Sequence, residues 1–377
     1  MDEGRVVNWL DLPSQLMDLI SEKLMIHITE FIRFGAVCHS WHSIYTQNRN
    51  RLPRQLPGLL LFTEPQPPTQ QQYQDQDQDR RQRRSHAFYD FTEKRVYKFP
   101  LQLPPHTDCH GSNQGWLIYE KESQLFLLNP FLSVDNEIHL PPLTTFILNE
   151  YESVEYYEFG NGQSFIHKAI LCGNPASSSN YLVVATDAYS SMLAFYKSGD
   201  KEWTSIITDE FEYIEDFIYY KDQLYVLDGH RGLFACDISS DPKVSKVAPP
   251  IGQVYAYDLV ESSGELLAVK KSNVGFEAYK LDQNLLDWVE IKSLSGGSLF
   301  IGANFSLSRL CSNYPGWEPN SVYMTIPRST IVANRAEVVR VYKLEVGNIE
   351  SLYLTESNPT VYSTAIWIEP TLRGCPN

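Results

Sequence analysis

The side chains of this chain that could do chemistry are histidines and carboxylates, but their spacing does not assemble a site. His39 and His42 lie three residues apart in a predicted helix and could both ligate a metal ion, yet no third ligand lies nearby. Two acidic runs could hold Ca²⁺ or act as general acids and bases. Their spacing instead favours solvated loops or strand edges. The runs contain Glu150, Glu152, Glu155, Glu158, Glu210, Glu212, Glu215 and Asp216.

Motifs for nucleophiles and cofactors are missing from the sequence. It contains no G-x-S-x-G elbow, no phosphate-binding P-loop and no H-E-x-x-H zinc motif. The six cysteines, at positions 38, 109, 172, 236, 311 and 375, include no C-x-x-C pair and mostly lie in apolar, strand-like contexts. We therefore predict no catalytic residue, no metal and no cofactor, and we interpret the cysteines as buried free thiols of an intracellular protein.

Composition limits the classes of partner. The 377 residues carry a net charge of −15, and 23 Tyr and 18 Phe favour strands. Residues 1–57 hold equal numbers of acidic and basic side chains, so the net charge resides on the remainder. An acidic chain is unsuited to non-specific binding of nucleic acids or anionic membranes. It also shows no apolar signal segment and no run long enough to span a membrane, so we expect neither kind of partner.

The first fifty residues have the pattern of three short helices. Ser14 is predicted to cap a helix in which Leu16, Leu19, Ile20 and Leu24 form one apolar stripe. Thr29 is predicted to cap a second helix over residues 30–34, which Gly35 ends, and a third runs over residues 37–45. Three helices of this size cannot bury much surface alone. The pattern therefore predicts that a partner or a neighbouring domain covers the apolar face.

The same segment, over residues 8–50, resembles an F-box. Leu-Pro at the start of the first helix and Val-Cys-x-x-Trp at the start of the third match that family's signatures. The resemblance implies an apolar face that binds a Skp-type adaptor, and through it a cullin. The residues carried over to this face are Leu12, Pro13, Leu16, Ile20, Leu24, Val37, Cys38 and Trp41.

From residue 57 to residue 377 the pattern changes to short strands separated by polar turns. Four strands recur about every 40–50 residues, most regularly over 165–208, 214–248 and 254–292, which is the period of a propeller blade. Units at 57–104, 113–141 and 297–356 bring the total to about six. Residues 365–368 form a leftover strand that we expect to close the ring with the first blade, because closure removes exposed sheet edges. The predicted fold is therefore mainly β, an F-box followed by a β-propeller.

The repeats are also similar to the kelch-like plant propeller family catalogued as domain of unknown function 295, which typically follows an F-box. The resemblance rests on segments that include His110–Leu117, Leu128–Phe131 and Trp203. Trp116, Trp203 and Trp288 fall at similar places in their units, which favours blade packing over a ligand cage. Residues 64–86, rich in Gln, Asp and Arg, are not a family feature, and we expect a disordered insert within the first blade. The basic residues 80–84 could act as a nuclear import signal or simply balance the preceding aspartates.

Taken together, the motifs favour the substrate-recognition subunit of a Skp–cullin–F-box ubiquitin ligase. Such a subunit works by proximity and has no catalytic residue of its own, and its partner would be an unknown target protein. A ligand- or glycan-binding or enzymatic propeller with an incidental helical N-terminus is the alternative. An F-box scaffold that binds the adaptor outside a ligase is a third possibility. We expect a location inside the cell, in the cytoplasm, the nucleus or both.

Overall fold

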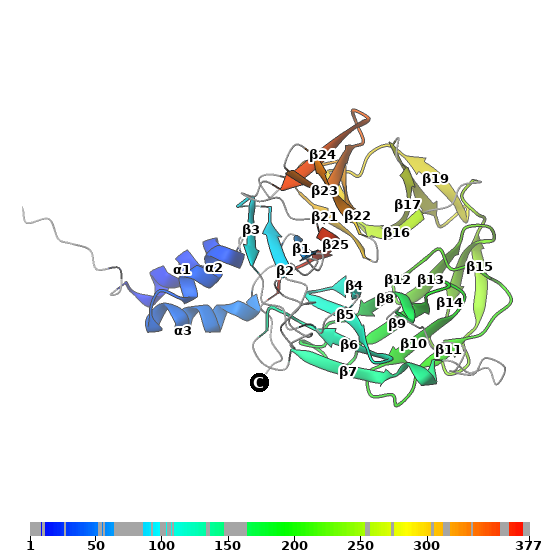
Figure 1. The fold of residues 1–377 in the computed structure, drawn as a ribbon, viewed down its shortest axis with the longest axis horizontal. Coiled ribbons are helices and arrows are strands. Elements are labelled where there is room, and N and C mark those ends of the chain that lie inside the picture. The colour runs from blue at the N-terminus through cyan, green and yellow to red at the C-terminus, as the bar shows by residue number, and fades with distance from the viewer. Residues whose placement is uncertain are drawn as a thin grey trace, which may run out of the picture.

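A computed structural model shows a small helical module attached to a ring of β-sheets (Figure 1). The structure describes residues 9, 12–25, 28–51, 55, 57–63, 86–91, 93–98, 103, 107, 109–132, 136–146, 164–252, 257–272, 275–302, 305–311, 317–332, 335–354 and 362–371.

Three helices form the N-terminal module: α1 (Ser14–Leu24), α2 (Ile28–Gly35) and α3 (His39–Asn48). The predicted helices are present, but their first residues differ from prediction. Pro13 is the N-cap of α1, and Ser14 is the first helical residue. Thr29 does not cap α2 and lies inside it, because its hydroxyl donates to a carboxylate of the propeller. Cys38 is the N-cap of α3, which continues three residues past Tyr45.

Six sheets surround a central axis and confirm the prediction of a six-bladed propeller. In each sheet one edge strand lies nearest the axis, and these inner strands are β4, β8, β12, β16, β21 and β25 (Figure 1). Contacts between β4 and β8, between β12 and β16, and between β16 and β21 join successive blades near the axis.

The first blade joins the first and last strands of the propeller. It contains β1 (Gly58–Thr63), β2 (His86–Asp90), β3 (Arg95–Lys98) and the C-terminal β25 (Tyr362–Ile368), in the order β25-β1-β2-β3. Antiparallel pairing of β25 with β1, with Leu60 opposite Ile366, closes the ring as predicted. Of the predicted insert, residues 64–85 lie outside the described residues. His86 belongs to β2, so the insert ends one residue earlier than predicted.

The next four blades are regular antiparallel sheets of four strands, which fits their sequence period. The second blade contains β4 (Cys109–Asn113), β5 (Trp116–Lys121), β6 (Gln124–Leu128) and β7 (Glu137–Pro142). The third contains β8 (Ile166–Cys172), β9 (Leu182–Asp187), β10 (Leu193–Lys197) and β11 (Thr204–Ile206). The fourth contains β12 (Asp216–Tyr220), β13 (Gln223–Asp228), β14 (Gly232–Cys236) and β15 (Val244–Ala248). The fifth contains β16 (Tyr257–Ser262), β17 (Glu265–Ser272), β18 (Gly275–Asp282) and β19 (Asp287–Ile291).

The sixth blade departs from this pattern, which explains its loose fit to the repeat. It has five strands in the order β21-β20-β22-β23-β24, and β20 pairs in parallel with β22. Its strands are β20 (Gly297–Ile301), β21 (Ser306–Leu310), β22 (Ser321–Val332), β23 (Arg335–Lys343) and β24 (Asn348–Leu354).

Indole N–H groups tie neighbouring blades together. Trp203 and Trp288 donate to the carbonyls of Pro141 and Pro249 in the preceding blades, at 3.0 and 3.1 Å. Trp116 instead lies in a second strand, not at the place equivalent to Trp203, and donates to Asn174 of the next blade at 3.0 Å. Buried Trp116 and Trp203 share one apolar cluster, which is consistent with the predicted role in blade packing.

Candidate adaptor-binding surface

The helical module has a small apolar core of its own. Met17, Phe34 and Ile44 are buried at its centre, one from each helix. Half-buried apolar side chains pack around this centre, namely Leu12, Ile20, Leu24, Trp41 and Tyr45. Polar contacts also join α1 to α3, because Asn48 Nδ2 donates to Asp18 Oδ1 at 3.0 Å and to Ser21 Oγ at 3.2 Å.

Glycine at position 35 lets α2 approach α3 closely. A β-carbon added there would lie 2.6 Å from Cγ of the Tyr45 ring. The same ring packs against the Phe31 ring in a tilted arrangement, with 4.9 Å between the ring centroids, so it has little room to move. A larger residue at the end of α2 would therefore separate the helices.

The propeller covers one side of the module. Met25, Ile28 and Phe31 form a buried cluster against Phe131, which follows strand β6. Gln55 joins the two parts: its side chain accepts from the Ile28 backbone at 3.0 Å and donates to the Met25 carbonyl at 2.9 Å. The neighbouring domain therefore buries part of the apolar surface that the sequence left uncovered.

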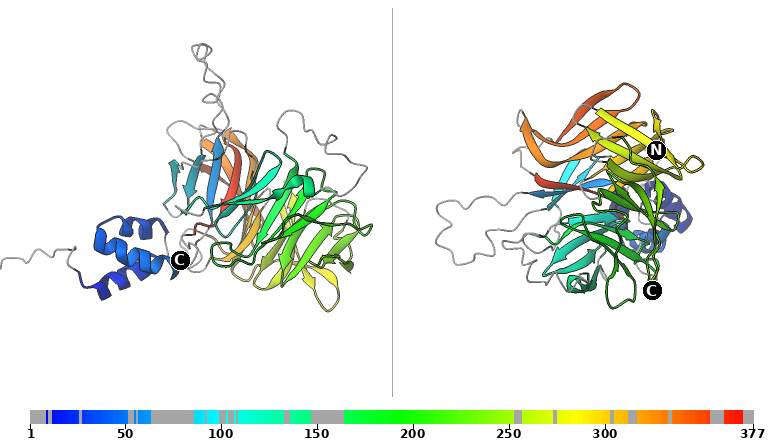
Figure 2. Two further views of the ribbon diagram at one scale, coloured as in Figure 1. Left: turned by 90° about the horizontal axis from the view of Figure 1, so that it is seen from below. Right: turned by 90° about the vertical axis from the view of Figure 1, so that its right-hand side faces the viewer.

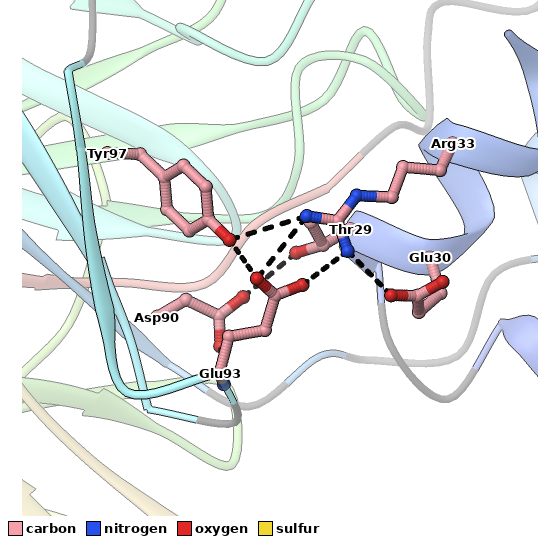
Figure 3. A network of polar contacts seen from close by, with 6 residues as sticks. All are labelled: Thr29, Glu30, Arg33, Asp90, Glu93 and Tyr97. Carbon is pink, nitrogen blue, oxygen red and sulfur yellow. Dashed lines mark hydrogen bonds and ion pairs between the residues drawn. The ribbon is translucent and has the colours of Figure 1, made fainter.

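A polar contact between α2 and the β2–β3 hairpin fixes this attachment at its edge (Figure 3). Thr29 Oγ1 donates to Asp90 Oδ2 at 2.8 Å. Arg33 donates to Glu93 at 2.7 Å, and to Tyr97 at 3.4 Å, and pairs with Glu30 of its own helix at 2.6 Å. The hydrogen bonds that Arg33 donates to Glu93 and to Glu30 raise the pKa of its guanidinium, with the bond to Glu93 as the larger cause. We call these residues, Thr29, Glu30, Arg33, Asp90, Glu93 and Tyr97, the hairpin clamp.

Other apolar side chains of the module remain exposed. Leu16 and Leu19 of α1 are 47% and 56% exposed, and Val37, between α2 and α3, is 51% exposed. Residues 16 and 19 share a helix face because residues three apart are neighbours on an α-helix. Burying a side chain of this size contributes about 1.5–3 kcal/mol. These exposed groups are therefore available to a partner.

The structure divides the eight predicted adaptor residues into two groups. Pro13, Leu16 and Val37 are exposed. The other five are half-buried, and four of them pack on the core of the module: Leu12, Ile20, Leu24 and Trp41, with Cys38 as the fifth. The half-buried residues would mainly hold the exposed contact residues in position, and only part of each side chain could contact an adaptor.

Some surface residues were not predicted. Leu19 belonged to the apolar stripe but not to the predicted contact set, and Ile32 and Trp9 are also exposed. For Leu19 of α1 and Ile32 of α2, apolar residues on more than one side of a short helix are the sequence signal that could have indicated them. Trp9 precedes α1 and has no such signal. In addition, the rings of Trp41 and Phe34 pack in a tilted arrangement with centroids 4.6 Å apart, and the buried indole N–H of Trp41 has no hydrogen-bond partner among the described residues.

The histidines and one acidic run also have defined places. His39 and His42 are exposed, and the described residues contain no group of three His, Cys, Asp or Glu side chains that could hold a metal ion.

Asp216 is buried and Glu215 half-buried, which corrects their interpretation as solvated. Their carboxylates accept from backbone N–H groups of β16. The run from Glu150 to Glu158 lies outside the described residues.

The described cysteines are free thiols. Cys109, Cys236 and Cys311 are buried, whereas Cys38 and Cys172 are half-buried, and Cys375 lies outside the described residues. Burial raises the pKa of Cys172 and of Cys236 to about 12, so neither is a thiolate at neutral pH.

No helix within the described part of the chain has the length and apolar character needed to cross a membrane.

Comparison with known proteins identifies the propeller. Residues 88–352, more than half of the chain, match the family model described as the KIB1-4 beta-propeller. The chain belongs to this family. The KIB1-4 match starts within β2 and ends within β24, so it contains the second to fifth blades, nearly all of the sixth, and the β2–β3 hairpin of the first.

Similarity also extends over the helical module. F-box protein At4g35733 of Arabidopsis thaliana is 23% identical over 93% of this chain and 95% of its own length. F-box protein SKIP23 of the same plant is 23% identical over 82% of this chain and 81% of its own. Among solved structures, TolB of Acinetobacter baumannii aligns with a TM-score of 0.43 and 11% identity, over 83% of this chain and 66% of that one. The sequence relatives are thus plant F-box proteins, which supports an F-box-like module before the KIB1-4 propeller.

Proposed function

We propose that this protein is the substrate-recognition subunit of a Skp–cullin–F-box ubiquitin ligase. Its helical module would bind a Skp-type adaptor, the adaptor would bind a cullin, and the propeller would hold a target protein. The protein would act without a catalytic residue of its own, by keeping the target near the conjugating machinery and raising its effective concentration. We place this activity inside the cell.

The observation that carries the proposal is the exposed apolar surface of the module. The propeller covers Met25, Ile28 and Phe31, yet Leu16, Leu19 and Val37 remain exposed. Leu16 and Leu19 are neighbours on one face of α1, and apolar side chains that lie together on a surface mark interaction sites more often than isolated ones do. The unpaired indole N–H of Trp41 supports the same conclusion, because an unsatisfied buried donor costs about 1–3 kcal/mol. An acceptor on a docked adaptor would remove that cost.

Two alternatives remain as proposals of lower rank. In the first alternative, the propeller binds a ligand or a glycan or acts as an enzyme. Its site would then work without any contribution from the helical module. A scaffold that binds the adaptor outside a ligase would make the same contact with the adaptor, but it would not cause degradation of a target protein. A closer relation to the kelch-like family of unknown function 295 also stays a prediction.

Adaptor binding tests the proposal directly. Leu16→Asp with Val37→Asp should weaken binding of a purified Skp-type adaptor by at least about tenfold, because two apolar contacts are replaced by charges. Asp at position 16 falls in the first turn of α1, where a negative charge suits the helix dipole, so the helix should persist. Ile207→Asp with Leu285→Asp, at exposed apolar positions of the propeller, is the matched control. Equal adaptor affinity for all three proteins would refute the assignment.

A further inference from the structure

A cavity of about 760 Å³ lies at the axis of the propeller, between its inner strands. Its wall includes Asn113 of β4, Cys172 of β8, Tyr219 of β12, Glu261 of β16 and Arg309 of β21. These residues lie at or near the C-terminal ends of their strands, whereas Lys168, Phe217 and Ser306 extend the wall toward the N-terminal ends. The cavity therefore starts at one end of the ring and continues along the inner strands. Its volume lies within the range of small-ligand pockets, roughly 300–1,000 Å³.

The cavity lies at the end of the propeller where the helical module is attached. Glu369, which follows β25, lines the cavity. The residue before it, Ile368, pairs with Gly58, where the chain from the module enters β1. Figure 2 shows the described C-terminal segment on the same side of the ring as the helices. A segment held in the cavity would therefore face the side on which an adaptor binds.

Most positive charges of the cavity wall are already compensated. Lys168 forms an ion pair with buried Asp216, and Arg309 forms one with Glu369. Lys197 directs its Nζ away to the carbonyl of Ile238, at 2.7 Å. These three cations therefore have partners within the protein.

Two carboxylates of the wall are exposed and form no ion pair within 4.0 Å among the described residues, although Glu261 attracts the ammonium of Lys221 from a longer distance. Asp200 and Glu261 receive only backbone N–H groups, from Lys197 at 3.3 Å and from Gly264 at 2.8 Å. Each carboxylate has a second oxygen that can accept from a ligand. Outside the two ion pairs, two carboxylates in the wall accompany the one ammonium of Lys197, so the remaining charge of the wall is negative.

Two serine hydroxyls in the wall provide an independent sign of a ligand. Ser112 is 1% exposed, and its Oγ has no hydrogen-bond partner in the described part of the chain. Ser306 Oγ is likewise buried and unpaired there. Buried polar groups are rarely left unsatisfied. Both residues line the cavity, so groups of a bound molecule could pair with them.

We infer that the cavity binds a peptide segment of a partner protein and that a lysine or arginine of this segment meets Glu261, while Asp200 of the third blade adds negative charge to the same wall. Peptide N–H and C=O groups would pair with the serine hydroxyls and with Asn180, and the half-buried ring of Tyr219 would pack against the basic side chain. The net charge of −15 complements a basic partner. The inference deepens the proposed function, on which it rests, by giving the chemistry of the target.

A displayed library of random twelve-residue peptides provides the probe. Selection on the immobilised full chain should enrich peptides with Lys or Arg at one fixed position. Glu261→Gln keeps an acceptor for Gly264 but removes the charge, and it should weaken a selected peptide by about tenfold. Glu290→Gln, at an exposed position on outer strand β19 of the same blade, is the matched control and should change nothing. Replacing the basic residue of the peptide by Gln should remove the difference between the two proteins.

Three results would overturn the inference: no enrichment, enrichment of Asp or Glu in place of a basic residue, or equal weakening by both substitutions. The last would show that the carboxylate at position 261 has no specific role. The double change Leu16→Asp with Val37→Asp separates this inference from the proposed function, because it should leave peptide affinity unchanged. If the variant keeps full adaptor affinity, the proposed function fails; if it loses affinity for the selected peptide, the inference about the cavity fails.

Discussion

Arg33 of α2 and Glu93 of the β2–β3 hairpin form an ion pair of 2.7 Å between segments 60 residues apart. Together with Thr29 and Asp90, the pair holds the helical module against the first blade, beside the apolar contact of Phe31 with Phe131. The direction in which the module points from the propeller therefore depends on side chains of both parts. In a ligase subunit, that direction would set where the target lies relative to the adaptor.

Reversing one charge of the hairpin clamp should loosen this attachment. Arg33→Glu would place a carboxylate against Glu30 and Glu93, so amide hydrogen exchange in α2 should become faster. Adding Glu93→Arg restores an attractive pair and should slow the exchange again. The matched control is Lys292→Glu, which reverses one charge of the exposed ion pair between Lys292 and Glu290, whose atoms lie 3.8 Å apart. It should leave exchange in α2 unchanged. Exchange that is unchanged by the reversal would show that the clamp does not hold the module.

Gly35→Ala should destabilise the helical module. The added methyl group would approach the Tyr45 ring to 2.6 Å, and overpacking of this kind costs about 1–3 kcal/mol. Urea unfolding followed through the module should show the loss, whereas Ala36→Ser, at the exposed neighbouring position, should not. A stability equal to that of the unchanged protein would mean that α2 and α3 can separate without cost.

Trp367→Ala should destabilise the propeller through its closing strand. Trp367 is fully buried, donates to the Ile301 carbonyl at 3.1 Å, and packs on Phe300 and Trp317. Such a truncation costs about 3–5 kcal/mol. Thermal unfolding should therefore shift to lower temperature, while Trp9→Ala, at an exposed indole, should leave it unchanged. An unshifted transition would contradict a role of β25 in ring closure.

Acid should destabilise the propeller partly through Asp228. Burial raises the pKa of this carboxyl, but backbone N–H groups of Glu212, His230, Tyr213 and Arg231 outweigh burial and lower it. A pKa lowered on folding gives stability that is present above the unfolded value and is lost as pH falls through the folded value. Asp228→Asn should therefore reduce stability at pH 7 by about 1–3 kcal/mol and flatten its fall below about pH 4. The measurement is the free energy of unfolding of both proteins as a function of pH. Two curves that fall in parallel below about pH 4 would contradict this role of Asp228.

The strand period and the leftover C-terminal strand were sufficient to predict the six blades and ring closure, because both follow from local patterning. The sixth blade was harder, since the parallel pairing of β20 with β22 leaves no periodic signal. The capping predictions for Ser14 and Thr29 were wrong. For Thr29, a contact with Asp90 replaced the local bond. The hairpin clamp and the central cavity bring together residues far apart in sequence, so no motif could indicate them.

Turnover of a bound partner tests the central claim most directly. A protein captured by the propeller should be co-expressed with the adaptor, the cullin and either the unchanged chain or the Leu16→Asp, Val37→Asp variant. Both chains should bind the partner equally, but only the unchanged chain should shorten the half-life of the partner, and the proteasome should be required for this effect. The Ile207→Asp, Leu285→Asp control should behave like the unchanged chain. If the variant with the altered helical module shortens the half-life just as well, the protein does not act as a ligase substrate receptor.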